Sequence, residues 1–408
     1  MGIIKRTTKA AMDDMNVIYT RDEMPDQIVK SIFLAGPTPR DKGTQSWRPE
    51  ALKLLADMGY DGTVFVPEYA PDHEDDMWED YKAQCEWERR SMNMSDVILF
   101  WVPRDMEFMP AMTTNVEFGT WLSSGKVVYG RPEDADRVRY LDRLAKERGM
   151  KVYSTLEATL KEAVDIVGDG SLRWGGERNV PLQIWDTEMF QGWYVMMQAA
   201  GNRLDEARQL WVFEVPGKGI FSYVLWVKIW IEDEQRFKEN EWIFSRRDIS
   251  TAVLYEHPVR IVDPFSDMFD ITVVLVREFR STARNDDGMI VELPGGSVEH
   301  GENAADAVAH EVSEETGLEL DGARFKRLDT RQVCATLSTH VSHLFSCELT
   351  KEEMDVVEKA ATRGDVHGVE EDTERTYLQL STVDELLKDK SVDWSTLGMV
   401  VKAVSEEV

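Results

Sequence analysis

The stretch 292–320, ELPGGSVEHGENAADAVAHEVSEETGLEL, is the most informative part of this 408-residue chain for both fold and chemistry. Asn303 is a favourable N-cap, because its side-chain oxygen can accept a hydrogen bond from the first turn of a helix. Gly317 suits the left-handed position that ends a helix. The pattern therefore predicts a helix over 303–316, with the two glycines of the PGG turn before it.

Three glutamates of this helix, Glu311, Glu314 and Glu315, are spaced three and four residues apart, which places them on one face. Carboxylates crowded in this way repel one another. A hard divalent cation such as Mg²⁺ or Mn²⁺ relieves the repulsion, and it can bind phosphate oxygens and polarise an attacking water. Gly295 lets the backbone come close to such an ion. The expected metal ligands are Glu311, Glu315 and Gly295, whereas a solvated acidic helix is the alternative reading.

The same stretch resembles the Nudix box, the signature of the Nudix hydrolase family. The matching residues are Gly296, Glu302, Glu311, Val312, Glu314, Glu315, Gly317 and Leu318. His310 stands where the family has arginine. The resemblance implies metal-dependent hydrolysis of a nucleoside diphosphate linked to another moiety, with Glu314 among the catalytic residues.

The flanking segments VVLVREFRS and GVEEDTERTYLQL are similar to those of ADP-ribose pyrophosphatases, a branch of that family. The likeness implies ADP-ribose or a related NAD-derived nucleotide as the substrate. Arg280 and Glu292 are then the expected substrate-binding residues. In this branch an acidic loop supplies a catalytic base or a further metal ligand, for which Glu371 and Glu374 are the candidates.

Strand-like apolar runs in the first part of the chain occur at 31–36, 64–68, 96–103 and 126–130, each separated from the next by a helical pattern. This alternation predicts an α/β domain with a small parallel sheet, flavodoxin-like or Rossmann-like. Ligands of such sheets bind outside the carboxyl ends of the strands. Gly36 and Arg40, which follow the first run, are therefore expected to bind a phosphate.

Residues 28–165 resemble nucleoside 2-deoxyribosyltransferase-like proteins through the segments IFLAGPTPR, SWRPEAL, VFVPE and TTNVEFGTWLSSGKVVYG. The resemblance implies that Glu117 is a nucleophile that attacks the anomeric carbon and forms a glycosyl-enzyme. It also implies that Glu88 handles the leaving base. Asn115, two residues before Glu117 in the same motif, is assigned to substrate binding.

The Gly-rich segment GDGSLRWGGERN shows no periodic apolar pattern, so we expect a linker at 169–180. This predicts a first domain over 1–168 and a second over 181–408. The second begins with aromatic and β-branched runs, which indicate a β-rich extension. Beyond the extension, the resemblance implies the α+β Nudix fold, an α/β/α sandwich around a mixed sheet.

A formal net charge of −29 argues against a nucleic-acid partner, because binding to a polyanion requires clustered basic residues. No apolar run is long enough to span a membrane, and no secretory leader is visible at the start of the chain. We therefore expect a cytoplasmic protein that acts on a small nucleotide. The ADP-ribose branch also implies a homodimer, with an interface supplied by residues 180–250.

Three functional hypotheses remain open at this stage. In the first, both domains are catalytic: one cleaves or transfers an N-glycosidic bond, and the other hydrolyses the diphosphate of the same nucleotide. In the second, the first domain is a noncatalytic nucleotide sensor that regulates the second. In the third, the substitution at His310 weakens the Nudix site, and the whole protein is a nucleotide receptor.

Overall fold

The computed structural model divides into two compact units, Met1–Phe244 and Ser245–Val408, which are described separately. It describes residues 15–41, 43–71, 81–215, 218–257, 268–368 and 374–407. Within these ranges no helix is long and apolar enough to cross a membrane.

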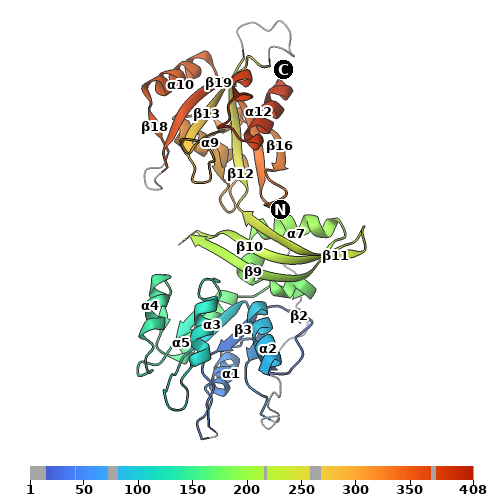
Figure 1. Cartoon of the computed structure of the whole chain (residues 1–408), viewed down its shortest axis with the longest axis vertical. Helices are drawn as coiled ribbons and strands as arrows, with labels where there is room; N and C mark the ends of the chain where they lie inside the picture. Colours follow the sequence, from blue (N-terminus) through green and yellow to red (C-terminus); the bar gives the residue numbers. More distant parts are fainter. Residues whose placement is uncertain are drawn as a thin grey trace. The chain divides into compact units, whose positions relative to one another are not determined.

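The first unit contains a six-stranded sheet in which every neighbouring pair of strands is parallel (Figure 1). The strand order is β1 (Asn16–Tyr19), β4 (Thr63–Val66), β3 (Ser31–Ala35), β5 (Val97–Trp101), β6 (Val127–Gly130) and β7 (Val152–Tyr153). The connecting helices are α1 (Arg48–Asp57), α2 (Tyr81–Met94), α3 (Met112–Trp121), α4 (Arg139–Glu147) and α5 (Leu156–Val167). The predicted parallel α/β fold is confirmed.

Helices cover both faces of this sheet, because successive side chains of each strand point in opposite directions. Ile32 and Leu34 of β3 pack in one core cluster with α1 and α5, whereas Phe33 packs in another with α2, α3 and α4. The chain runs from β3 to β4 on one side of it and then crosses to β5 on the other side. The carboxyl ends of β3 and β5 therefore form the topological switch point, where this class of sheet binds its ligands.

Residues 169–244 complete the first unit. The strand β8 (Arg173–Trp174) pairs with β2 (Gln27–Ile28), and the 3₁₀ helix η1 (Gly175–Asn179) follows it. A three-stranded sheet lies beyond the helices α6 and α7, with the order β11-β10-β9. The bounds are α6 (Leu182–Trp185), α7 (Glu188–Ala199), β9 (Arg203–Val215), β10 (Gly219–Ile231) and β11 (Arg236–Arg246).

The predicted domain boundary differs from this division. Residues 169–180 were expected to form a linker, but Arg173 and Glu177 in this segment are buried. Residues 181–244 were expected to extend the second domain, yet Tyr223 of β10 and Phe190 of α7 share a core cluster with strand β3. The Gly-rich composition of this segment is typical of a linker. Its buried position instead depends on the contact between Arg173 and Asp96, which lies far away in sequence.

The second unit is built on an eight-stranded mixed sheet with the main order β16-β17-β12-β13-β19-β18, to which β14 and β15 are added through β13 and β12. Strands β12 and β17 are parallel, and β13 is antiparallel to both β12 and β19. The bounds are β12 (Ile249–Glu256), β13 (Thr272–Phe279), β14 (Met289–Glu292), β15 (Gly295–Ser297), β16 (Lys326–Gln332), β17 (Val341–Glu348), β18 (Val366–His367) and β19 (Thr376–Thr382).

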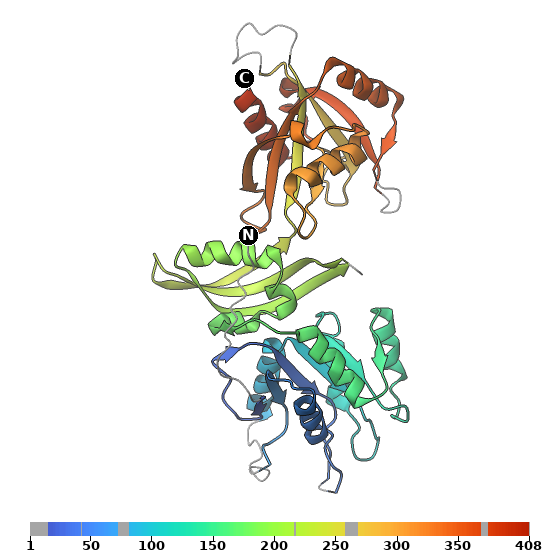
Figure 2. The ribbon, with the colours of Figure 1, turned by 180° about the vertical axis from the view of Figure 1, so that it is seen from behind.

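Helices lie on both faces of this second sheet (Figure 2). On one face, α9 (Ala304–Thr316) and α10 (Lys351–Arg363) pack on Leu254 and Val276. On the other face, α11 (Val383–Leu386) and α12 (Trp394–Glu407) pack on Val253 and Leu275. The predicted α/β/α sandwich with a mixed sheet is confirmed.

Candidate active sites

The helix α9 carries the acidic residues of the second unit and begins and ends as its sequence predicts. Asn303 caps its first turn, with the side-chain oxygen accepting a hydrogen bond from the Ala305 N–H at 3.0 Å. Gly317 adopts the left-handed conformation at φ 72°, and its N–H donates to the Ser313 carbonyl at 2.9 Å.

Two glutamates of α9 face the glycines of β15. The buried Glu315 carboxylate accepts a hydrogen bond from the Gly295 N–H at 2.9 Å. The Glu311 carboxylate lies so close to Gly296 that a Cβ at this position would overlap it. Only glycine leaves room for this approach. Glu314 is exposed instead, so of the three carboxylates predicted to share one face, Glu315 is buried, Glu311 is half-buried and Glu314 faces solvent.

Burial and repulsion from neighbouring carboxylates raise the pKa values of Glu311 and Glu315. Burial is the main cause that raises the pKa of Glu311 to about 7, and the charges of Glu314 and Glu374 add to it. Burial also raises the pKa of Glu315 well above its ordinary value, against the lowering effect of the Gly295 N–H. Such a cluster loses its protons readily only when positive charge is close.

The oxygen atoms of this cluster suit a hard divalent cation. Across the described ranges, no three or more His, Cys, Asp or Glu residues gather as a metal-holding group. Magnesium does not require such a cage, because it commonly binds through one or two carboxylates, with water and substrate phosphates completing its shell. Glu311 and Glu315, whose carboxylates both approach strand β15, fit that smaller donor set.

Two arginines lie near the acidic pair. Arg280 forms ion pairs at 2.8 Å with both Glu292 and Glu278, so the two residues predicted to bind substrate, Arg280 and Glu292, contact each other. Arg246 donates to the Ser297 hydroxyl at 3.2 Å, and its pKa is lowered by burial and by the charge of Arg280. Arg246, the last residue of β11, was not among the residues predicted from the sequence.

The remaining acidic candidates are placed differently from one another. Glu374 is close enough to raise the pKa of Glu311, Glu315 and Glu278. Glu371 lies outside the described residues. His310, which stands in the position of the family arginine, is exposed, and its Nδ1 lies 3.4 Å from a carboxylate oxygen of Glu302. This imidazole therefore lies beside the acidic residue of the turn before the helix.

In the first unit, the loop after β3 is held tightly at the switch point. Gly36 has φ +153°, and a Cβ there would overlap the carbonyl oxygen of Trp101 at the end of β5. The buried guanidinium of Arg48 donates to the Gly36 carbonyl at 2.8 Å and to the Thr38 hydroxyl at 3.1 Å, and it pairs with Glu68 at 2.5 Å. Arg48 organises the loop, although the sequence analysis did not single it out.

The structure brings Glu88 of α2 and Glu117 of α3 together. The pKa of Glu117 is raised to about 7, mainly by burial and also by the charge of Glu88, while Arg48 opposes the shift. Burial likewise raises the pKa of Glu88, against a hydrogen bond from Gln84 at 3.1 Å. Two carboxyl groups in one partly buried site, with an arginine nearby, are suited to acid–base or nucleophilic chemistry at a sugar.

The other predicted residues of this site are less closely involved. The exposed Asn115 accepts a hydrogen bond from the buried Arg104 through its side-chain oxygen. Arg40 is exposed; its backbone N–H donates to the Phe108 carbonyl at 3.0 Å, and its side chain has no hydrogen bond or ion pair to any described residue. Of the phosphate-binding pair predicted after β3, Gly36 lies at the switch point, whereas Arg40 faces solvent.

Comparison with known protein families matches two separate parts of the chain. Residues 29–135 match the family described as nucleoside 2-deoxyribosyltransferase like, and residues 259–393 match the NUDIX domain. A comparison with curated proteins gave no match. The NUDIX match supports metal-dependent hydrolysis of nucleoside diphosphate derivatives by the second unit, where Glu311 and Glu315 lie. The chain therefore joins a nucleoside 2-deoxyribosyltransferase-like domain in its first unit to a NUDIX domain in its second.

Proposed function

We propose that the second unit hydrolyses the diphosphate of a nucleotide of the ADP-ribose type. The observation that carries this proposal is the close approach of Glu311 and Glu315 to the backbone of β15, with Arg246 and Arg280 nearby. Carboxylates on one side and guanidinium groups on the other suit a substrate that arrives with both metal and diphosphate.

Each group of this site has a proposed task. Glu311, Glu315 and the Gly295 backbone would hold Mg²⁺ or Mn²⁺, which would supply charge neutralisation at the phosphates and activation of water. Arg280, positioned by Glu292, would bind the substrate. Glu314 and Glu374 are the candidate bases in the described region, because both lie close enough to affect the pKa of Glu311.

Product analysis with purified full-length protein tests this assignment. We expect AMP from ADP-ribose only when Mg²⁺ or Mn²⁺ is present, and we expect Glu315→Gln to abolish it. Glu358→Gln, at an exposed position of α10, serves as the control and should leave turnover unchanged. If no diphosphate substrate is cleaved at any metal concentration, the second unit is a nucleotide receptor, and the exposed His310 becomes the first position to restore to arginine.

We propose further that the first unit cleaves an N-glycosidic bond of a nucleoside or nucleotide. The Glu117 carboxylate would attack the anomeric carbon as the bond to the base breaks, and the Glu88 carboxyl would give its proton to the leaving base. Water or a second base would then displace Glu117. The proposal rests on the proximity of the two acids beside the Gly36 loop.

The pH profile and a matched pair of variants test this second activity. The proposed mechanism needs an ionised Glu117, whose pKa is about 7, and a protonated Glu88, so base release should pass through a maximum as the pH rises. Glu117→Gln should eliminate base release from NAD and deoxynucleosides, whereas Glu147→Gln on the exposed side of α4 should not. If the wild-type protein binds these nucleosides without releasing base, the first unit is a sensor.

Exposed aromatic side chains on β9 support the expected homodimer. Trp211 and Phe213 are 45% and 47% exposed, and their rings stack at a centroid distance of 6.0 Å. Large exposed apolar groups of this kind are enriched in protein interfaces. Light scattering of the full chain should give the mass of a dimer, and Trp211→Ser combined with Phe213→Ser should shift it to a monomer. A wild-type monomer at micromolar concentration would contradict this.

A further inference from the structure

A polar cavity occurs in the first unit, and neither Glu88 nor Glu117 lines it. Its volume is about 480 Å³, within the usual range for small-molecule sites of roughly 300–1,000 Å³. The walls come from the last turns of α2, from η1 and from the neighbouring strands β9 and β10. The basic lining residues are Arg89, Arg90, Arg178 and Arg208.

Two arginines of this cavity contact an aromatic ring and a backbone carbonyl. In the described part of the chain, Arg89, Arg90 and Arg208 form no ion pair, and Arg208 lies over the ring of Trp226, with 4.4 Å between its Cζ and the ring centroid. Arg178 donates to the Gly175 carbonyl at 2.8 Å. In a chain with a net charge of −29, a pocket that gathers four guanidinium groups stands out from its surroundings.

The acidic residues of the lining are already engaged. Lys228 lies 3.2 Å from Asp205 and 3.7 Å from Glu206, so these two carboxylates are partly neutralised from outside the cavity. Burial lowers the pKa of Arg178, the charge of Asp26 opposes this shift, and the charge of Arg90 adds to it. The positive charges of the cavity therefore repel one another, and an anion between them would relieve that repulsion.

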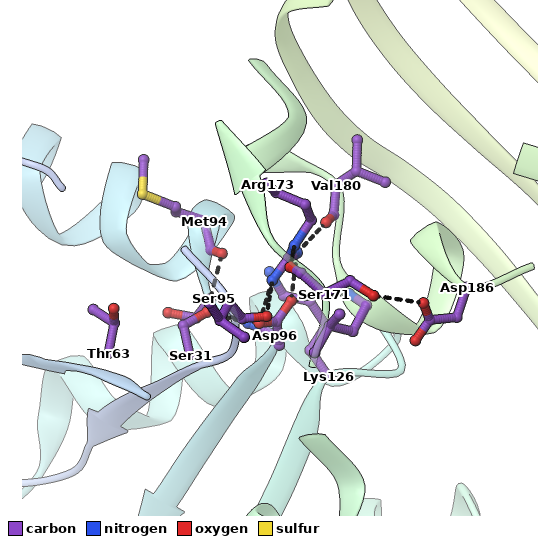
Figure 3. Close-up of polar contacts among 12 residues, drawn as sticks. Ser31, Thr63, Met94, Ser95, Asp96, Lys126, Ser171, Arg173, Val180 and Asp186 are labelled. Atoms are coloured by element: carbon purple, nitrogen blue, oxygen red, sulfur yellow. Dashed lines mark hydrogen bonds and ion pairs between the residues drawn. The ribbon is translucent and has the colours of Figure 1, made fainter. Parts of the chain in front are cut away.

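A buried network holds the walls of the cavity in place (Figure 3). Asp96, just after α2, forms two contacts of 2.8 Å with the fully buried Arg173, which precedes η1. The ammonium group of Lys126 donates to the carbonyls of Met92 and Asn93 at 2.7 and 3.0 Å, which satisfies the end of α2. The result is a fixed spacing between α2 and η1.

A direct hydrogen bond fixes the third wall. The Asn93 side-chain amide at the end of α2 donates to the Ala207 carbonyl of β9 at 3.1 Å. The pocket is therefore preorganised, and binding would not require the arginine-bearing elements to move together. Fixed walls lower the entropic cost of binding, and the exposed side chains of Arg89, Arg90 and Arg208 then adjust to the ligand.

We propose that this cavity is a binding site for a phosphorylated small molecule, whose phosphate oxygens take N–H donors from Arg89, Arg90 and Arg178. Guanidinium groups donate two parallel hydrogen bonds to phosphate, which makes arginine the preferred residue for such a contact. A phosphate group carries between one and two negative charges at neutral pH, which is of the order of the unpaired positive charge here. No residue assigned to either proposed catalytic centre lines this cavity.

Calorimetric titration of the full chain with inorganic pyrophosphate and with AMP, in the presence of a metal chelator, tests the proposal. We expect one bound equivalent per chain, and we expect Arg89→Ala combined with Arg90→Ala to weaken binding by about tenfold or more. Arg143→Ala on α4 removes an exposed arginine of the same unit and should have no effect. The relative affinities for pyrophosphate and AMP show whether the site prefers a diphosphate or a phosphomonoester.

Two further variants separate this site from the others. Arg280→Ala should retain the binding, since the residue belongs to the second unit; loss of binding there would place the anion in the NUDIX domain and overturn the proposal. Unchanged binding by the Arg89→Ala, Arg90→Ala protein, or no binding by the wild type, would overturn it as well. A short single-stranded oligonucleotide that binds more tightly than pyrophosphate would identify the surface as a nucleic-acid site instead. A thermal melt of each variant confirms that it is folded.

Discussion

Removal of Arg173 should destabilise the first unit strongly. Its guanidinium is fully buried, makes two 2.8 Å contacts with Asp96, and donates to the backbone carbonyls of Ser171 and Val180 at 3.2 and 2.5 Å. In Arg173→Met the Asp96 carboxylate would stay buried, with only the Ser31 hydroxyl and a backbone N–H left to donate to it.

The expected magnitude follows from the cost of an uncompensated buried charge. Breaking a buried ion pair by removing one partner costs about 3–5 kcal/mol. Adding Asp96→Asn to Arg173→Met removes that charge, so the double variant should recover part of the loss. Arg143→Met, which breaks the exposed pair with Glu147, should cost about 0.5 kcal/mol or less.

Urea unfolding of the full chain, followed by hydrogen exchange of peptides from each unit, measures these differences. Peptides from β3 and β5 should lose protection in Arg173→Met, while peptides from β12 and β13 in the second unit provide the internal reference. A loss below about 1 kcal/mol would refute the reasoning. So would a double variant that is no more stable than Arg173→Met, because the cost would then come from packing and not from the buried charge.

Three further changes have defined outcomes. The neutral Glu117 carboxyl contributes stability that is present below pH 4.5 and lost as the pH rises through about 7, so Glu117→Gln should flatten the pH dependence of first-unit stability in urea titrations over that window. Gly36→Ala should cost about 2 kcal/mol or more, measured by thermal unfolding, because its Cβ would overlap the Trp101 carbonyl; a neutral effect would mean that the loop can move. Gly317→Ala should cost about 1–2 kcal/mol, because an alanine there must keep φ at 72° and its Cβ would approach the His367 ring at 3.0 Å; an unchanged melting temperature would contradict this.

Local chemistry in the sequence was sufficient to predict much of both units. The ends of α9 follow from Asn303 and Gly317, because capping depends on residues that are neighbours in the chain. The parallel sheet of the first unit follows from alternating apolar strands and helices, since its strands are buried on both faces. Glu311 and Glu315 were identified from the resemblance to the Nudix box together with helical spacing, and the structure places both against the Gly295–Ser297 strand.

Only the tertiary structure decided the features that depend on distant partners. Residues 169–180 look like a linker until Arg173 is seen to pair with Asp96, which lies 77 positions earlier. The effect of Glu88 on the pKa of Glu117 depends on how α2 and α3 pack, which neither helix encodes by itself. Glu314 shares the spacing of its neighbours, yet it faces solvent, because helical periodicity defines a face but not what covers it. Sequence patterns report local geometry, whereas burial and charge pairing are properties of the packed chain.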